Sequence, residues 1–140
     1  MGIPFRIRQI KTLQFAMFPD LLAKGPEVNV RAEFSFGINN EVNDIRCVSK
    51  ILYEQGEQML LIIEVHCFFD VSSEGSRQLV EQGRVKVDFL RYLATIATGT
   101  VRGIICAKTE GTELSSYVLP PINLVELIKE DFVFKSKDAI

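Results

Sequence analysis

The sequence has little of the chemistry that enzymes use. It holds one histidine, His66, and no tryptophan, so one chain cannot supply a His-based catalytic triad or a two-His metal site. No phosphate loop, dinucleotide fingerprint, zinc-ligand spacing or paired-carboxylate motif is present. We therefore expect no enzymatic activity and no bound cofactor or metal.

Other absences narrow the class of protein further. The net charge is −2 and no basic stripe occurs, so we expect no nucleic-acid partner. No apolar stretch reaches the length of a membrane span, and the first residues do not resemble a secretory signal. The three cysteines are odd in number and scattered, which suits a reducing cytoplasm and argues against a disulfide framework. We expect one cytoplasmic domain over residues 1–140.

The most informative segment that is present is an apolar run, MLLIIEVHCFF, at residues 59–69. Its first half has no polar face, as expected for a strand that is buried on both sides. Alternating patterns predict three more strands, at residues 4–18, 28–36 and 45–53. The first of these carries apolar residues in both phases, which suggests burial on both faces and a bulge near residues 9–11. We expect the four consecutive strands to form an antiparallel meander.

Helices are predicted mainly in the second half of the chain. Two apolar stripes at helical spacing indicate a long, largely buried helix from about Val85 or Asp88 to Ala107, with Asp88 as a candidate cap. Gly99 and Gly103 lie one turn apart and would allow close packing of another backbone. Asn123 followed by Glu126 predicts a capped last helix to about Phe132. The expected fold is α+β: a four-stranded antiparallel meander backed by one long and one short C-terminal helix.

Three polar residues in or beside the apolar run are candidate site residues. His66 is best interpreted as a hydrogen-bonded sheet residue, and Cys67 as an inert thiol, because an apolar strand raises the pKa of a thiol. Glu64 is a carboxylate in an otherwise apolar strand. It either pairs with a nearby Lys or Arg, or marks an acidic docking surface, and the sequence favours neither.

Five segments, taken in order, resemble the protein-export chaperone SecB. They span Phe5 to about Ile128, and the resemblance lies both in their sequences and in their order along the chain. The segments are FRIRQIKTLQFAMFP at the first strand, Gly25-Pro26-Glu27-Val28 before the second, Ile63-Glu64-Val65 in the fourth, FLRYLATIATGTVRG in the long helix, and LPPINLVELI before the last helix.

This resemblance implies an α+β subunit that assembles as a dimer of dimers, with long helices packed between sheets. It implies a chaperone that holds unfolded or export-destined polypeptides in apolar grooves and passes them to the motor protein SecA. By alignment, the SecA contacts of the fourth strand fall on Ile62 and Glu64. Acidic contacts of the family's first strand fall on Gln14 and Phe18, which are not acidic and argue against docking to SecA.

The composition agrees with a binding role, because such a short chain has few helices to cover its apolar strands. We therefore expect a homo-oligomer, a dimer or a dimer of dimers, that binds unfolded clients. An adaptor or antitoxin-type chaperone for one partner remains an alternative, as does a small-molecule pocket that uses His66, Glu64 or Tyr92. The candidate client or subunit surfaces are Phe5, Ile7, Phe15, Phe18, Phe34 and Phe36.

Overall fold

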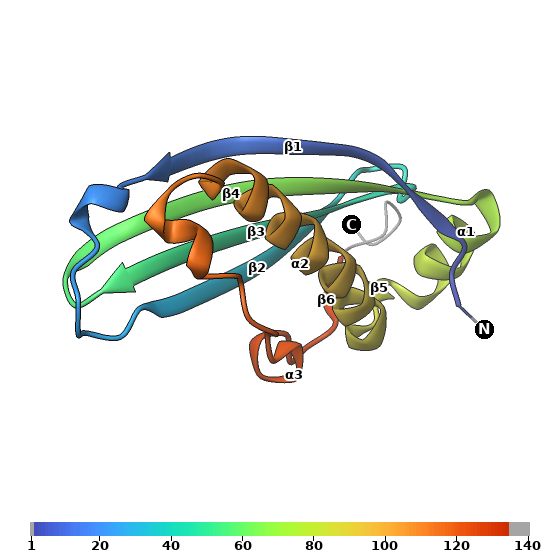
Figure 1. Ribbon diagram of the computed structural model, residues 1–140. Coiled ribbons are helices and arrows are strands. Elements are labelled where there is room, and N and C mark those ends of the chain that lie inside the picture. The colour runs from blue at the N-terminus through green and yellow to red at the C-terminus, as the bar shows by residue number, and fades with distance from the viewer. Residues whose placement is uncertain (1, 135–140) are drawn as a thin grey trace.

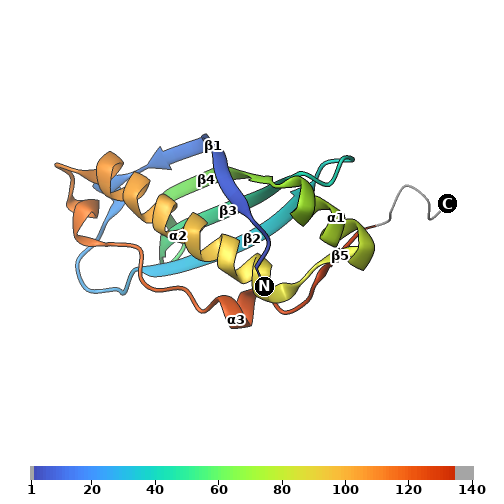
Figure 2. The ribbon, with the colours of Figure 1, turned by 90° about the vertical axis from the view of Figure 1, so that its right-hand side faces the viewer.

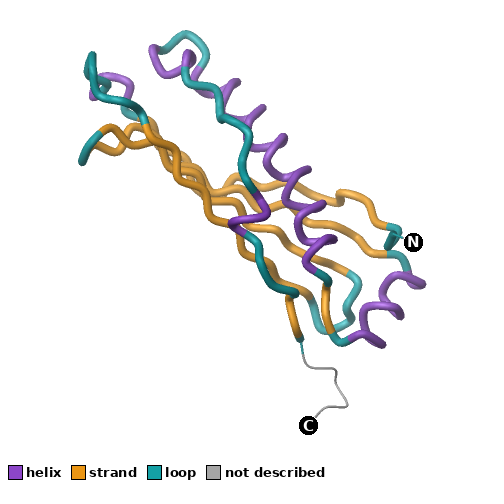
Figure 3. The backbone as a smooth tube through the Cα atoms, turned by 90° about the horizontal axis from the view of Figure 1, so that it is seen from below, coloured by secondary structure: helices purple, strands orange, loops and turns teal. Residues whose placement is uncertain are grey.

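The computed structural model describes residues 2–134 and confirms the α+β class. Four long antiparallel strands form the main sheet: β1 (Phe5–Met17), β2 (Asn29–Ile38), β3 (Asp44–Gln55) and β4 (Gln58–Val71). The helix α2 (Val87–Thr109) runs across one face of this sheet, which we call the helix face. Among the described residues no helix covers the opposite face, which we call the open face (Figures 1 and 3).

The strand order is β1-β4-β3-β2, so the predicted meander is right for β2, β3 and β4 and wrong for β1. The first strand pairs with β4 instead of β2. A link that contains the short helix η1 (Pro19–Leu21) carries the chain past the ends of β4 and β3 to the far edge. This order places β4 in the interior of the sheet, where its apolar run has a neighbouring strand on each side.

The strand β1 is bulged, as predicted, but not at residues 9–11: two irregularities flank that stretch, which itself pairs regularly with β4. The register with β4 shifts between Ile7 and Gln9 and again between Thr12 and Gln14. Each shift changes the phase of the strand, so Ile10 pairs with Cys67 and joins Ile7 on the helix face. The expected burial of β1 on both faces is therefore wrong for the described chain, because most of the strand is exposed at the sheet edge.

The core lies between the helix face and α2. Alternate residues of β3 and β4, from Ile45 to Tyr53 and from Leu61 to Phe69, are buried there. One stripe of α2, which includes Leu93, Ala97 and Val101, packs against them. The long helix is thus buried along one side and exposed along the other, where the sequence indicated burial on nearly all sides.

The remaining elements surround the ends of α2 (Figure 2). The helix α1 (Ser73–Gln82) follows β4, with Ser72 as its cap. The strand β5 (Arg84–Val85) pairs with β6 (Phe132–Val133), and between them in the chain lie η2 (Glu113–Ser116) and α3 (Leu124–Leu127). In residues 2–134 no helix is long and apolar enough to cross a membrane.

Two predictions about helix ends are wrong in part. Asn123 does cap the last helix by accepting a hydrogen bond from the Glu126 amide, but α3 then ends after one turn. The chain continues as an extended segment that buries Ile128 and brings Asp131 to the start of α2. There the Asp131 carboxylate, instead of Asp88, accepts a hydrogen bond from the Val87 amide at 2.8 Å.

Candidate functional site

The two residues aligned with SecA contacts lie on the open face. Ile62 is half-buried, and the Glu64 side chain is 21% exposed. One Glu64 oxygen lies 2.7 Å from Nε2 of His66 and the other 3.8 Å from Nζ of Lys50. The hydrogen bond from His66, followed by the charge of Lys50, lowers the pKa of Glu64 against the opposing effect of burial. The carboxylate is thus paired, as one of its two interpretations required.

The other polar residues of the apolar run have structural surroundings. His66 is buried and engaged by Glu64, which confirms its interpretation as a hydrogen-bonded sheet residue. Cys67 lies opposite Cys47 in the neighbouring strand, and both are free thiols in the core. Burial raises the pKa of Cys67 and raises that of Cys47 to about 12, which makes both poor nucleophiles at neutral pH.

The six candidate aromatic and aliphatic residues separate into distinct places. Phe5 and Phe15 lie at the β1 edge of the helix face, where Phe5 makes edge-to-face contacts with rings of α2 and Nζ of Lys108 lies 4.9 Å from the Phe15 ring centre. Ile7 lies between them and is 41% exposed. Phe18 follows the end of β1. Phe34 and Phe36 lie on β2, at the other edge of the sheet.

A segment that we call the strap, residues 118–128, runs beside β2 on the helix face (Figures 1 and 2). Arginines of α2 bind its backbone oxygens at both ends. Arg102 donates to the carbonyls of Leu119 at 2.7 Å and Pro120 at 3.0 Å, and Arg91 donates to that of Ile128 at 2.9 Å. The side chains of Leu119 and Ile128 are buried. The strap is therefore fixed at its two ends.

A tyrosine hydroxyl fixes the residue just before the strap. Tyr53 of β3 donates a hydrogen bond to the carbonyl of Tyr117 at 2.9 Å. Burial raises the pKa of Tyr53 to about 12, so the hydroxyl remains a donor throughout the neutral range. Sequence reasoning missed these anchors. The signal was present in Arg91 and Arg102, which with Lys108 are the three cations of a largely apolar helix.

The middle of the strap is less closely packed, and α3 has no buried residue. Two open clefts lie between the strap and β2, with volumes of about 430 and 450 Å³. Leu127 of α3 lines both. The first cleft reaches Val30 and Ala32, and the second reaches Phe34 and Phe36. We call the two clefts together the β2 groove. Apolar side chains of β2 and of the strap line it, and so do charged residues: Arg31, Glu33, Glu126, Lys129, Glu130 and Asp131.

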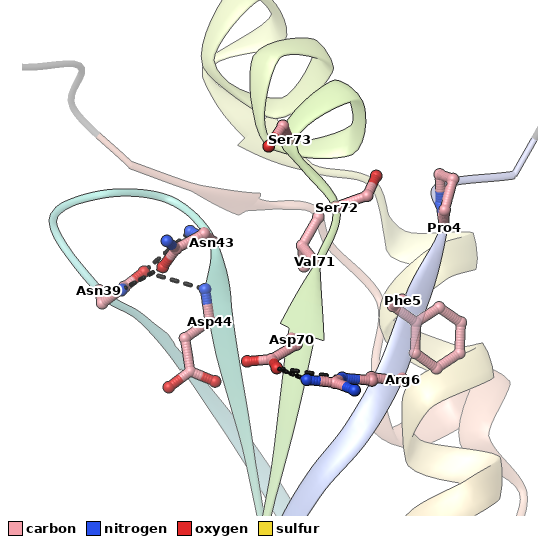
Figure 4. A pocket seen from close by; sticks show the side chains of 10 residues that line it. All are labelled: Pro4, Phe5, Arg6, Asn39, Asn43, Asp44, Asp70, Val71, Ser72 and Ser73. Atoms are coloured by element: carbon pink, nitrogen blue, oxygen red, sulfur yellow. Dashed lines mark hydrogen bonds and ion pairs between the residues drawn. The ribbon is translucent and has the colours of Figure 1, made fainter.

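A larger cleft, of about 630 Å³, lies at the end of the sheet between the start of β1, the β2–β3 turn and the end of β4 (Figure 4). Its polar groups mostly bind one another. Arg6 donates to Asp70 at 3.2 Å, and Asn39 holds the turn by binding Asn43 and the Asp44 amide. The exception is Asp44, one of whose carboxylate oxygens is buried without a hydrogen-bond partner among the described residues. Because the other groups are already paired, this cleft has less to offer a ligand than the β2 groove.

The residues suggested for a small-molecule pocket do not converge. Glu64 and His66 lie on the open face, whereas Tyr92 lies on α2 over the helix face and is 56% exposed. None of the three lines either cleft of the β2 groove or the larger cleft. Among the described residues, no group of histidine, cysteine and carboxylate side chains could hold a metal ion.

Comparison with known proteins finds a similar fold among the solved structures. Neither the family models nor the curated proteins match the sequence. Among solved structures, the chain is similar to the Mycobacterium tuberculosis SecB-like chaperone Rv1957 in complex with a ChAD peptide from the antitoxin HigA1. The TM-score is 0.53 at 14% sequence identity, over 84% of this chain and 90% of that one. The likeness supports a SecB-like α+β fold for this chain.

Proposed function

We propose that the protein is a molecular chaperone of the holdase type, which binds extended apolar segments of polypeptides in the β2 groove without catalysis. The observation that carries this proposal is the position of Phe34 and Phe36, which pack against the edge of the core but are only half-buried and line an open cleft. Apolar contact is non-directional, so such a groove accepts many sequences. The strap supplies the second wall.

The structural neighbour supports a polypeptide ligand. It is a SecB-like chaperone bound to a peptide from an antitoxin. The same observation favours a second candidate, a chaperone dedicated to one partner. Delivery to SecA is not part of the proposal, because Glu64 is paired with Lys50 and His66 instead of being a free acidic contact.

Self-association completes the proposal. The β1–α2 face, formed by Ile7 and Ile10 of β1 and by Tyr92, Gly99 and Gly103 of α2, exposes large apolar side chains: Ile10 is 45% exposed and Tyr92 56%. Burying such side chains is favourable by roughly 25 cal/mol per Å² of apolar area. No described atom within 4 Å would meet a methyl group added at either glycine. We propose that a second copy covers this face.

The holdase proposal is tested by light scattering from a thermally unfolding protein mixed with the chain. We expect suppression near stoichiometric ratios, whereas an adaptor for one folded partner would leave scattering unchanged. The informative variant is Leu127→Ser, because Leu127 lines both clefts and is 47% exposed. Its matched control is Val125→Ser, on the same helical turn, 61% exposed and outside both clefts.

We expect the Leu127 variant to lose much of the suppression and the Val125 variant to retain it, with unchanged circular dichroism in both. If the two variants suppress light scattering equally, the client does not bind in the β2 groove. A wild-type chain that suppresses no aggregation, but captures one partner from its native lysate, would favour the dedicated chaperone.

A further inference from the structure

The open face carries an excess of positive charge at the end nearest the β2–β3 turn. Four cations lie there near the ring of Phe68, on the adjacent strands β1 and β3. The Arg8 guanidinium lies 5.1 Å from the ring centre, and Nζ of Lys11 lies 5.9 Å from it. Arg46 stands opposite Phe68 in the pairing of β3 with β4. We call this group the Phe68 patch; its members are Arg6, Arg8, Lys11, Arg46 and Phe68.

Only part of this charge is balanced within the chain. Arg8 lies 2.7 Å from one carboxylate, Asp44, and 3.4 Å from another, Asp70. Arg6 lies 3.2 Å from the same Asp70 (Figure 4). In the part of the chain that the structure describes, the other two cations form no ion pair, and both are exposed. The patch thus has four cations for two carboxylates, although the whole chain has a net charge of −2.

The rest of the open face has no such excess. Lys50 pairs with Glu64, and Arg31 pairs with Glu54. Glu33 stands opposite Lys50 in the pairing of β2 with β3. The cations of that region are therefore matched by carboxylates, and the positive excess is confined to one end of the sheet. A surface with charge of one sign attracts partners of the opposite sign.

The patch borders a cleft of about 270 Å³ on the open face, which Phe68, Arg46 and the end of β2 line. A methyl group added at Gly37 would lie 3.2 Å from Nη2 of Arg46, so the glycine leaves room for the guanidinium beside β2. Asp44 also lines the cleft, but Arg8 binds one of its oxygens and the other is buried. The cleft therefore presents an aromatic ring and an unpaired guanidinium to a ligand.

The separation of the two unpaired cations restricts the ligand further. Since β1 and β3 flank β4, and Lys11 and Arg46 are offset by two residues along it, their backbones lie roughly 12 Å apart. This separation suits two acidic groups better than one. In an extended polypeptide, the side chains at i and i+4 lie on one face about 13 Å apart, with that of i+2 between them. Acidic residues at i and i+4 and an aromatic residue at i+2 match the arrangement of the patch.

We propose that the Phe68 patch is a docking site for an acidic segment of a partner protein. Its carboxylates bind Lys11 and Arg46, and an apolar side chain between them packs against Phe68. This site lies on the other face of the sheet from the β2 groove, so the inference goes beyond the proposed holdase function. A protein is favoured over a nucleic acid, because only two cations of the patch are unpaired and the chain as a whole is negative.

The test measures binding of fluorescein-labelled, serine-rich peptides to the full chain by fluorescence anisotropy at low salt. One peptide carries glutamate at i and i+4 and phenylalanine at i+2, and a second has lysine in place of glutamate. We expect the acidic peptide alone to bind, and added salt to weaken its binding. The double variant Lys11→Ala and Arg46→Ala should bind it about fivefold less tightly, the effect of losing two exposed ion pairs. The matched control, Lys24→Ala with Arg77→Ala, removes the same charges from exposed positions outside the patch and should keep the affinity.

Equal binding of the acidic and basic peptides, or equal losses in the two double variants, would overturn the proposed docking site. A ten-nucleotide DNA strand that binds more tightly than the acidic peptide, and does so through Lys11 and Arg46, would overturn a protein partner. Loss of peptide binding in Leu127→Ser would place the peptide in the β2 groove and also overturn the inference. If no peptide binds, the inference fails, while suppression of aggregation still tests the holdase separately.

Discussion

The glycine pair of α2 gives the sharpest test of how this molecule packs. Gly99 and Gly103 are exposed, have helical backbone angles, and would meet no described atom within 4 Å if a methyl group were added. Alanine favours a helix by about 0.8–1 kcal/mol relative to glycine, so the double substitution Gly99→Ala and Gly103→Ala should stabilise the isolated subunit by about 2 kcal/mol. For a chain of this length, that raises Tm by roughly 7 °C.

The same substitutions should weaken assembly if a second copy packs its backbone against the glycines. We expect sedimentation to show less oligomer for the double variant, while urea unfolding at low concentration shows a more stable subunit. If the double variant is less stable than the wild type at low concentration, the surface around the two glycines is not free of contacts within the subunit. If the variant gains stability and assembles as the wild type does, the glycines do not lie in the interface between subunits.

Three further predictions concern the interior and the strap. Cys106 is exposed and should react with a thiol reagent under native conditions. Cys47 and Cys67 should react only after unfolding in urea, because burial raises their pKa values. Fast reaction of all three cysteines in the native protein would contradict the packing of β3 on β4. Asp131→Asn should lower stability at neutral pH, because the bond from the Val87 amide, followed by the Arg84 side chain, lowers the pKa of Asp131. A lowered folded-state pKa stabilises above the ordinary aspartate pKa and loses this effect as pH falls through the folded value, so the two proteins should converge in acid urea titrations. Tyr53→Phe should cost about 1 kcal/mol in urea unfolding and speed amide exchange in the strap, because the Tyr117 carbonyl loses its donor.

Much of the sheet could be predicted from the sequence because its signal is local. The run at residues 59–69 identified β4, whose observed bounds are Gln58–Val71. The Gly56 turn joined it to β3. The neighbour of β1 could not be predicted in this way, because pairing with β4 depends on contacts distant in sequence. The face of the sheet on which Ile10 lies could not be predicted either, since each bulge reverses the alternation of faces that sequence patterns assume.

The β2 groove was less predictable than the strands because its second wall has no periodic pattern. Leu119-Pro120-Pro121 indicates only that the chain cannot continue as helix or as an interior strand, since proline lacks an amide donor. Arg91 and Arg102 hold the strap in place by donating hydrogen bonds from α2 to its carbonyls. These hydrogen bonds hold the backbone at the two ends of the strap, and the side chains between those ends are not needed to keep it in place. For that reason Leu127 stays accessible above Phe34 and Phe36, and a groove forms where a longer last helix could have packed into the core.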